Sequence, residues 1–199
     1  MAGIYIHIPF CRHKCNYCNF YSLASTRNMD QVSNAIVSEL QQRRDYLSGQ
    51  PVETIYFGGG TPSMLQVQDI EKILNAVYPN FSVAPDAEIT LEANPDDVAP
   101  GKLKAFKNSG INRLSIGVQS FRQEDLNFLS RTHTPEQVIQ CIGDAQQAGF
   151  SNLSIDLIYG IPTLTDEGWM QNLQQVFSLG IPHISAYSLT VEDKTPLAV

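Results

Sequence analysis

The chain has 199 residues, with 13 Lys and Arg against 20 Asp and Glu, which gives a formal net charge of −7. Its residues are 43% hydrophobic and 17% charged, a balance that suits one globular domain and excludes an intrinsically disordered chain. The acidic balance disfavours nucleic acid as a partner. No apolar run reaches the roughly 18 to 20 residues of a membrane helix, and with no signal peptide and only four cysteines we expect a cytoplasmic protein.

Strand and helix patterns alternate along the whole chain. The expected strands span 4–9, 54–58, 88–94, 113–119, 152–159 and 183–190, and the expected helices span 30–48, 66–78, 100–109, 123–148 in two pieces, and 166–179. Apolar residues at three- and four-residue spacing mark the helices, as in Ile70, Ile73, Leu74 and Val77. This alternation predicts right-handed strand–helix–strand units and a parallel sheet.

Within most strands, apolar residues alternate with polar ones. Leu114, Ile116 and Val118, for example, alternate with Ser115 and Gln119. One parity packs on helices, and in a barrel the polar parity faces the lumen, where it suits a polar ligand. An antiparallel sheet with one wet face is the alternative, which the intervening helices disfavour. Six strands are too few for an eight-stranded barrel, so we expect an α/β fold, a partial (βα)6 TIM-like barrel that occupies 1–199 and stops after strand six.

Three cysteines, Cys11, Cys15 and Cys18, form a C-x3-C-x2-C pattern directly after the first strand. A structural zinc ion normally takes a fourth protein ligand, for which His13 is the candidate nearby. A cubane cluster normally takes four thiolates, so three cysteines leave one iron open to an external ligand. The spacing favours iron–sulfur over zinc or structural thiols, and Cys141, on an apolar helix face, is expected to be a buried hydrophobe.

The cysteine pattern resembles the signature of the radical S-adenosylmethionine (SAM) superfamily. The chain is similar to one branch, that of oxygen-independent coproporphyrinogen III oxidase and the radical SAM heme chaperone. The matching stretches are IYIHIPFCRHKCNYC, YFGGGTPS, ITLEANPDD, RLSIGVQSF, IDLIYGIP and ISAYSLTVE. The resemblance implies a radical SAM core barrel, a 4Fe-4S cluster ligated by the three cysteines, and SAM bound at the open iron.

The resemblance also implies a set of SAM-contacting residues, most of them near strand ends: Tyr5, Tyr17, Gly59, Gly60, Thr61, Glu92, Gln119, Arg131 and Asp156. For several of them a structural role is the alternative. The glycines could form a plain strand-to-helix turn, Glu92 could pair with a lysine or arginine across the barrel, and Arg131 could be a solvated helix charge. Asp125 and Glu167 are expected on solvated helix faces, and His7 is expected to be a hydrogen-bonded structural histidine.

Two local features favour the chaperone within this branch. Cys18 is followed by Asn19 and Phe20, without the further cysteine of the oxidase, and Met1 lies close to the first strand, without the oxidase's N-terminal extension. The favoured function is therefore to bind heme and deliver it to a respiratory acceptor protein, with an electron donor as a second partner and a heme-ligand motif expected in a further C-terminal domain. The alternatives are oxidative decarboxylation of coproporphyrinogen propionates through a 5′-deoxyadenosyl radical, and a zinc or cluster domain with another substrate.

Overall fold

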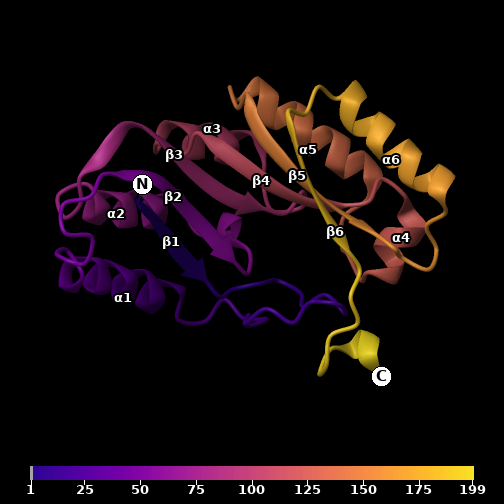
Figure 1. The fold of residues 1–199 in the computed structure, drawn as a ribbon, viewed down its shortest axis with the longest axis horizontal. Helices are drawn as coiled ribbons and strands as arrows, with labels where there is room; N and C mark the ends of the chain where they lie inside the picture. Colours follow the sequence, from indigo (N-terminus) through magenta and orange to yellow (C-terminus); the bar gives the residue numbers. More distant parts are fainter. Residues whose placement is uncertain (1) are drawn as a thin grey trace.

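The computed structural model describes residues 2–199. Six strands form one sheet in the order β1-β2-β3-β4-β5-β6, and every neighbouring pair is parallel (Figure 1). The strands are β1 (Ala2–Ile8), β2 (Val52–Gly59), β3 (Val83–Ala93), β4 (Arg113–Gln119), β5 (Asn152–Tyr159) and β6 (His183–Ser188). The predicted partial (βα)6 barrel is confirmed.

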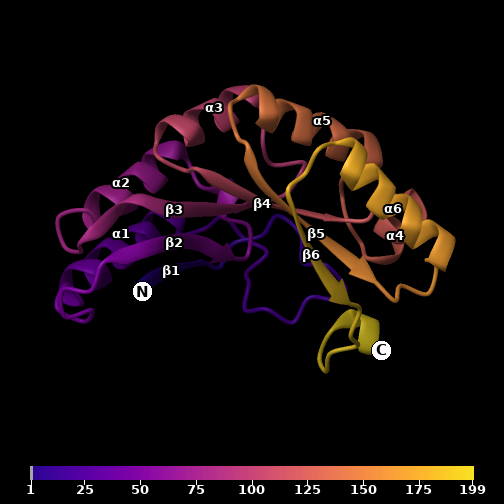
Figure 2. The same ribbon diagram turned by 45° about the horizontal axis from the view of Figure 1, so that its top comes forward.

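Helices connect the strands and cover one side of the sheet. They are α1 (Met29–Gln42), α2 (Val67–Val77), α3 (Pro100–Asn108), α4 (Gln123–Phe128), α5 (Pro135–Gln147) and α6 (Asp166–Ser178), with short 3-10 helices η1 (Pro62–Met64) and η2 (Pro196–Ala198). Figure 2 shows the helices along the convex side of an arched sheet, with the long loop after β1 on the concave side. The concave side is therefore the open lumen of a partial barrel.

The core lies between the sheet and the helices. Phe57, Leu91 and Leu114, from three neighbouring strands, are fully buried, as are Ile70 and Ile73 on the inner face of α2. Each such side chain contributes roughly 1.5 to 3 kcal/mol by leaving water. Cys141 on α5 is also buried, as predicted.

The first predicted helix ends earlier than expected, whereas the 123–148 segment forms two helices, as predicted. The first ends at Gln42 rather than at residue 48, because the apolar periodicity lapses and the chain passes through turns, in which the amide of Tyr46 bonds the carbonyl of Arg43. The 123–148 segment breaks into α4 and α5 before Pro135, which lacks an amide hydrogen and restricts the residue before it. Thr134 caps the second piece. β3 begins at Val83 rather than at residue 88, because Val83 pairs with Val52.

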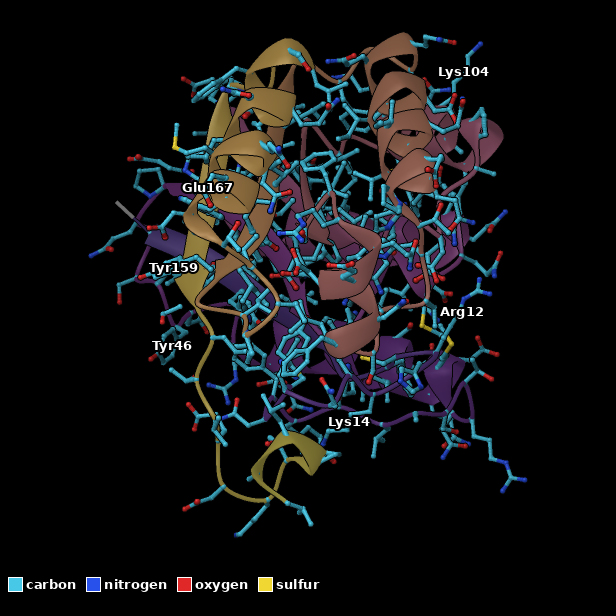
Figure 3. All side chains as sticks on the ribbon, turned by 90° about the vertical axis from the view of Figure 1, so that its right-hand side faces the viewer. Arg12, Lys14, Tyr46, Lys104, Tyr159 and Glu167 are labelled. Carbon is cyan, nitrogen blue, oxygen red and sulfur yellow. The ribbon has the colours of Figure 1, made fainter. Side chains whose placement is uncertain are left out.

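The two acidic residues predicted on solvated helix faces behave differently. Glu167 on α6 is exposed (Figure 3). Asp125 on α4 is fully buried, so the prediction for it is wrong. Hydroxyl groups of Ser120 and Thr163, from two neighbouring loops, donate to its carboxylate at 2.7 Å each. Helix periodicity does not reveal such partners, because they come from other elements.

No helix among residues 2–199 has the length and the apolar character needed to cross a lipid bilayer.

Candidate functional site

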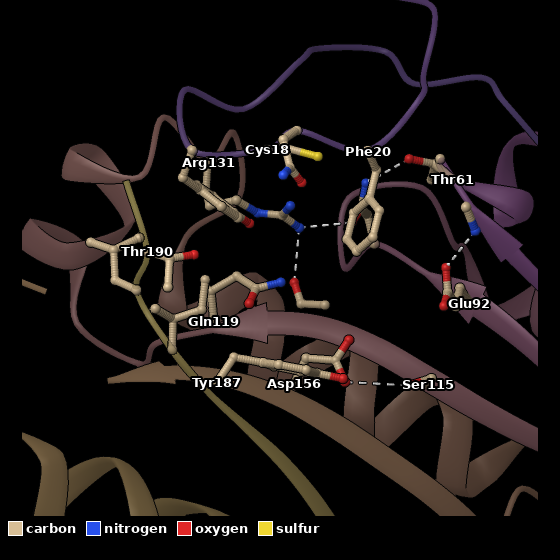
Figure 4. A pocket seen from close by; sticks show the side chains of 18 of the residues that line it. Cys18, Phe20, Thr61, Glu92, Ser115, Gln119, Arg131, Asp156, Tyr187 and Thr190 are labelled. Atoms are coloured by element: carbon tan, nitrogen blue, oxygen red, sulfur yellow. Dashed lines mark hydrogen bonds between the residues drawn. The ribbon is translucent and has the colours of Figure 1, made fainter. Parts of the chain in front are cut away.

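A cavity of about 430 Å³ opens on the concave side of the sheet, near the carboxyl ends of the strands (Figure 4). This is the end at which TIM-like barrels place their sites. Its lining comes from the loop after β1, the turn after β2, strands β3 to β5, and the chain from β6 onward. The lining residues are Tyr17, Cys18, Asn19, Phe20, Gly59, Gly60, Thr61, Glu92, Ala93, Asn94, Ser115, Gly117, Gln119, Arg131, Asp156, Ile158, Tyr187, Ser188, Leu189, Thr190 and Glu192.

The cysteine loop (residues 9–28) covers one side of this cavity. Its base is closed by two backbone hydrogen bonds between neighbouring segments, from Cys11 N to Leu23 O at 3.0 Å and from Leu23 N to Pro9 O at 2.7 Å. The imidazole of His7 lies 3.1 Å from the carbonyl of Tyr21, so the histidine ties β1 to this loop, in agreement with its predicted structural role.

The three cysteines of this loop are free thiols, each only partly exposed. Thr61 Oγ1 lies 3.6 Å from Cys11 Sγ, Arg131 Nη1 lies 3.4 Å from Cys15 Sγ, and Cys18 lines the cavity itself. Burial raises the pKa of Cys18, and the neighbouring Cys15 and Cys11 raise it further. Cys11 and Cys15 are therefore close enough to Cys18 to affect its ionisation.

The donor set of the loop fits a cluster better than a single ion. Within residues 2–199, no group of three or more His, Cys, Asp or Glu side chains is arranged to hold one metal ion. A zinc ion needs its ligands around one atom, whereas a cubane distributes three thiolates over three irons. Three cysteine thiols in one loop are the donor set that a cubane with one open iron takes, so the residues present fit an iron–sulfur cluster.

Arg131 lies in the turn between α4 and α5, not in a helix. Its guanidinium donates to Asn94 Oδ1 at 2.7 Å and to the carbonyl of Gly117 at 2.8 Å. Burial alone would lower its pKa, but Tyr17 and Cys15 raise the pKa overall. The alternative of a solvated helix charge is wrong, because this cation is held inside the cavity beside Cys15.

Asn94 connects two parts of the site, and the sequence reasoning missed it. Its side-chain nitrogen donates to Thr61 Oγ1 at 3.2 Å, while its oxygen accepts from Arg131. It therefore links the glycine turn to the buried arginine. Asn94 follows Thr90 and Glu92 at two-residue spacing, and this lumenal parity is the signal that could have identified it.

The glycine turn packs directly on the start of the cysteine loop. The amide of Gly60 donates to the carbonyl of Ile8 at 2.8 Å, and the amide of Thr61 donates to the carbonyl of Phe10 at 2.6 Å. A Cβ atom on Gly60 would lie 2.5 Å from the Phe10 carbonyl oxygen. Close packing against the cysteine loop therefore requires glycine at position 60. The same lack of a side chain leaves the backbone accessible to a ligand.

Two carboxyl groups share the cavity. Glu92 accepts hydrogen bonds from the Tyr56 hydroxyl at 2.8 Å and from the Gly59 amide at 3.0 Å, while burial raises its pKa. Burial and the charge of Glu92 raise the pKa of Asp156 to about 6, and Ser115 donates to it at 3.4 Å. Neither carboxyl group forms an ion pair within residues 2–199. The expected alternative of a lysine or arginine partner is therefore wrong for Glu92, and the pair suits a ligand with cationic or hydroxyl groups.

The two predicted tyrosines differ in position. Tyr17 is buried beside Arg131 and lines the cavity, and burial raises its pKa. Tyr5 is 59% exposed and does not line the cavity. Its ring stacks on Tyr56 with centroids 5.9 Å apart, and the Tyr56 hydroxyl in turn donates to Glu92.

The wall of the cavity that follows β6 was not predicted as part of the site. Thr190 and Glu192 come from this segment, Tyr187 comes from β6 itself, and Phe20 of the cysteine loop also lines the cavity. The stretch ISAYSLTVE carried part of the sequence resemblance, but its spacing assigned no specific role to Tyr187, Thr190 or Glu192. Only the folded chain brings this segment to the cavity.

Comparison with known proteins gives consistent results. The heme chaperone HemW of Lactococcus lactis is 38% identical over 192 residues, which are 96% of this chain and 50% of that protein. HemW of Escherichia coli is 38% identical over 195 residues, which are 97% of this chain and 52% of that protein. This chain therefore spans about half the length of these curated relatives.

Among solved structures, coproporphyrinogen III oxidase (HemN) from Escherichia coli, described as a radical SAM enzyme, superimposes with a TM-score of 0.86. It is 31% identical to this chain, and the match covers 94% of this chain and 44% of that one. A sequence model of the Radical SAM superfamily matches residues 5–176. Because this match includes the cysteine loop, the glycine turn and five of the six strands, the chain belongs to the Radical SAM superfamily.

Proposed function

We propose that residues 1–199 form the radical SAM barrel domain of a heme chaperone, which binds heme and delivers it to an acceptor protein in the cytoplasm. The observation that carries this proposal is the match of almost the whole chain to proteins named heme chaperone in distantly related bacteria. The chain Cys18-Asn19-Phe20 supports it, since it lacks a further cysteine directly after the cluster pattern.

Membership of the family implies a 4Fe-4S cluster and SAM. Within the proposal, Cys11, Cys15 and Cys18 hold the cluster, and the buried guanidinium of Arg131 offsets part of the thiolate charge. When bound, the reduced cluster supplies an electron to the sulfonium of SAM. The protein's own part is to position the cluster and SAM and to shield them from solvent. The cysteine loop, which covers one side of the cavity, would provide this shielding.

The lumenal residues are proposed to hold SAM. The Gly59 and Gly60 backbone with Thr61 would receive its methionyl end, and Glu92, Asp156 and Gln119 would accept or donate hydrogen bonds to its amino group and ribose. Two desolvated carboxyl groups without an ion-pair partner among residues 2–199 support this assignment, because a cationic ligand offsets their desolvation. Tyr17 would contact the same ligand from the cysteine loop, and Tyr5 would act through Tyr56.

The test is heme transfer by the full-length protein that contains this domain, after anaerobic cluster reconstitution, because the heme-ligand motif is expected outside residues 1–199. Heme is titrated by absorbance, and the heme-loaded chain is then mixed with a heme-free globin as acceptor. We expect saturable heme binding, transfer to the globin, and no conversion of coproporphyrinogen III in the presence of SAM and a reductant. Conversion to protoporphyrinogen IX would instead support the oxidase, for which the 31% identity to HemN is the observation in favour. Absence of saturable heme binding would overturn the chaperone proposal.

A further inference from the structure

A buried polar cluster lies beside the cavity without lining it. This Asp125 network consists of Asp125 on α4, Ser120 after β4, Thr163 after β5, and Asn172 on α6. Asp125, Ser120 and Asn172 are each at most 1% exposed. Burying a carboxylate costs free energy unless it is hydrogen-bonded. The Asp125 carboxylate accepts hydrogen bonds from Ser120 Oγ and Thr163 Oγ1, each at 2.7 Å.

Ser120 is the centre of this network. Besides bonding Asp125, its oxygen accepts from Asn172 Nδ2 at 3.1 Å and from the Arg122 amide at 3.2 Å. Asn172 Oδ1 also accepts from the Phe121 amide at 2.9 Å. The chain just after β4 is thus held by side chains from α4 and α6, so its path is fixed by two helices.

The residue directly before Ser120 has an unusual backbone. Gln119 adopts φ 68°, in the left-handed region that non-glycine residues rarely occupy. The register between β4 and β5 also shifts between Ile116 and Gln119, where Ile116 faces Ile155 and Gln119 faces Leu157. Such a bulge redirects a side chain, and a strained conformation persists only where its surroundings hold it.

This bend directs the amide of Gln119 into the cavity, below Arg131 (Figure 4). A Cβ atom on Gly117 would lie 3.0 Å from Gln119 Nε2, 3.3 Å from Asn94 Oδ1 and 3.4 Å from Arg131 Nη2. The Gln119 amide therefore lies next to Gly117 together with the Arg131 guanidinium, which contacts Cys15, and the Asn94 amide, which contacts Thr61. If the backbone of Gln119 left its left-handed conformation, its side-chain amide would move away from Arg131 and Asn94.

We infer that Asp125 and Ser120 are positioning residues, which hold Gln119 in its left-handed conformation and thereby align its amide with SAM. The inference rests on the proposal that SAM occupies this cavity. Neither Asp125 nor Ser120 lines the cavity, and both act on the ligand through Gln119, the residue directly before Ser120. Ser120→Ala removes the hydroxyl that holds this neighbour, while every residue that lines the cavity keeps its own side chain unsubstituted.

The experiment is a double-mutant cycle on SAM affinity. The full chain is reconstituted with its cluster, and SAM dissociation constants are measured by equilibrium dialysis and normalised to cluster content. We expect Ser120→Ala to weaken SAM binding about five- to tenfold, the range that one net hydrogen bond supplies. In a Gln119→Ala background, the same change should alter SAM affinity less than twofold, because the residue that it positions is already gone.

Two outcomes would overturn the inference: an equal loss from Ser120→Ala in both backgrounds, or unchanged SAM affinity in Gln119→Ala itself. If Ser120→Ala does not fold, Thr163→Val takes its place, because Thr163 is exposed and its change removes one bond to Asp125. Glu124→Gln is the control, since it alters an exposed carboxylate on the same helix and should leave SAM affinity unchanged. Heme is absent throughout, so a failure of the chaperone proposal would not affect this result.

Discussion

The ionisation of individual residues determines what the cavity can accept. Glu92 is stabilised by two hydrogen bonds, whereas Asp156 faces it with a weaker bond from Ser115 and a pKa raised to about 6. Burial and electrostatic repulsion from Glu92 therefore both disfavour the ionised form of Asp156 when no ligand is bound. A bound cationic group would relieve this repulsion, and the cost in the empty protein should be measurable.

Asp156→Asn should stabilise the cluster-free, SAM-free protein at high pH. The folded state holds the Asp156 proton more tightly than the unfolded state, so the stability tied to that proton is present below about pH 4 and is lost as the pH rises through about 6. At pH 8 the variant should gain roughly 2 to 3 kcal/mol in free energy of unfolding, a gain that disappears near pH 4. Urea denaturation across this pH range measures it. Asp86→Asn, at an exposed position, is the matched control, and equal pH profiles for wild type and Asp156→Asn would contradict the prediction.

Tyr56→Phe should weaken SAM binding although Tyr56 does not line the cavity. Its hydroxyl donates to Glu92 Oε1 at 2.8 Å, so its removal destabilises the charged carboxylate and frees it to rotate. We expect the SAM dissociation constant to rise about tenfold at unchanged cluster content, as for a lost hydrogen bond to a charged group. Tyr46→Phe is the matched control, because Tyr46 is 74% exposed. Equal SAM affinity in the two variants would show that Glu92 does not depend on this hydroxyl.

At the scale of elements, strands place the site and connecting loops complete it. The alternation along β4 correctly predicted that Ser115 and Gly117 face the lumen, because a strand repeats every two residues. Gln119 also lines the cavity, but it does so past a register shift and with a left-handed backbone, which the alternation did not predict. Loops have no such period. For this reason the sequence did not reveal that Arg131 lies in a turn or that the chain after β6 forms a wall of the cavity.

The Asp125 network illustrates the same limit. A lone acid on a short helix has the pattern of a surface charge. Its partners Ser120 and Thr163, and Asn172 that bonds Ser120, lie on three other segments that only the tertiary fold brings together. Helix ends were predictable where local chemistry marks them, as at Thr134 with Pro135. They were missed where the apolar pattern fades gradually, as at the end of α1.

Thr134→Ala should lower the stability of the fold through α5. The Thr134 hydroxyl accepts from the Gln137 amide, and the Gln137 side chain accepts from the Thr134 amide at 2.8 Å, which completes a capping box. The loss of this cap should cost about 1 kcal/mol in free energy of unfolding. Chemical denaturation measures it, with Gln147→Ala at the exposed far end of the same helix as control. A loss no greater than that of the control would mean that the cap is not formed in solution.

At the scale of the whole molecule, the cysteine loop connects segments that are distant in sequence. Arg12 forms an ion pair with Asp97, which follows β3. Asn16 donates to the carbonyl of Phe128 at 2.6 Å, and its own carbonyl accepts from the Leu197 amide at 3.0 Å. A group that orders this loop therefore acts on both ends of the barrel as well as on the cavity.

Cluster reconstitution should consequently raise the stability of the entire chain. A group that binds only the folded state stabilises it by mass action, and the loop contacts pass this constraint to three other parts of the fold. We expect the reconstituted protein to be brown and to melt several degrees above the cluster-free protein. Each kcal/mol of added free energy of unfolding should raise the melting temperature by about 2 to 4 °C. Replacement of Cys11, Cys15 and Cys18 by Ala should abolish both the colour and the difference in melting temperature. Cys141→Ala should retain both, although the cavity it leaves in the core lowers the melting temperature of both forms. Colour and a melting difference that survive the triple replacement would show that the cluster is ligated elsewhere.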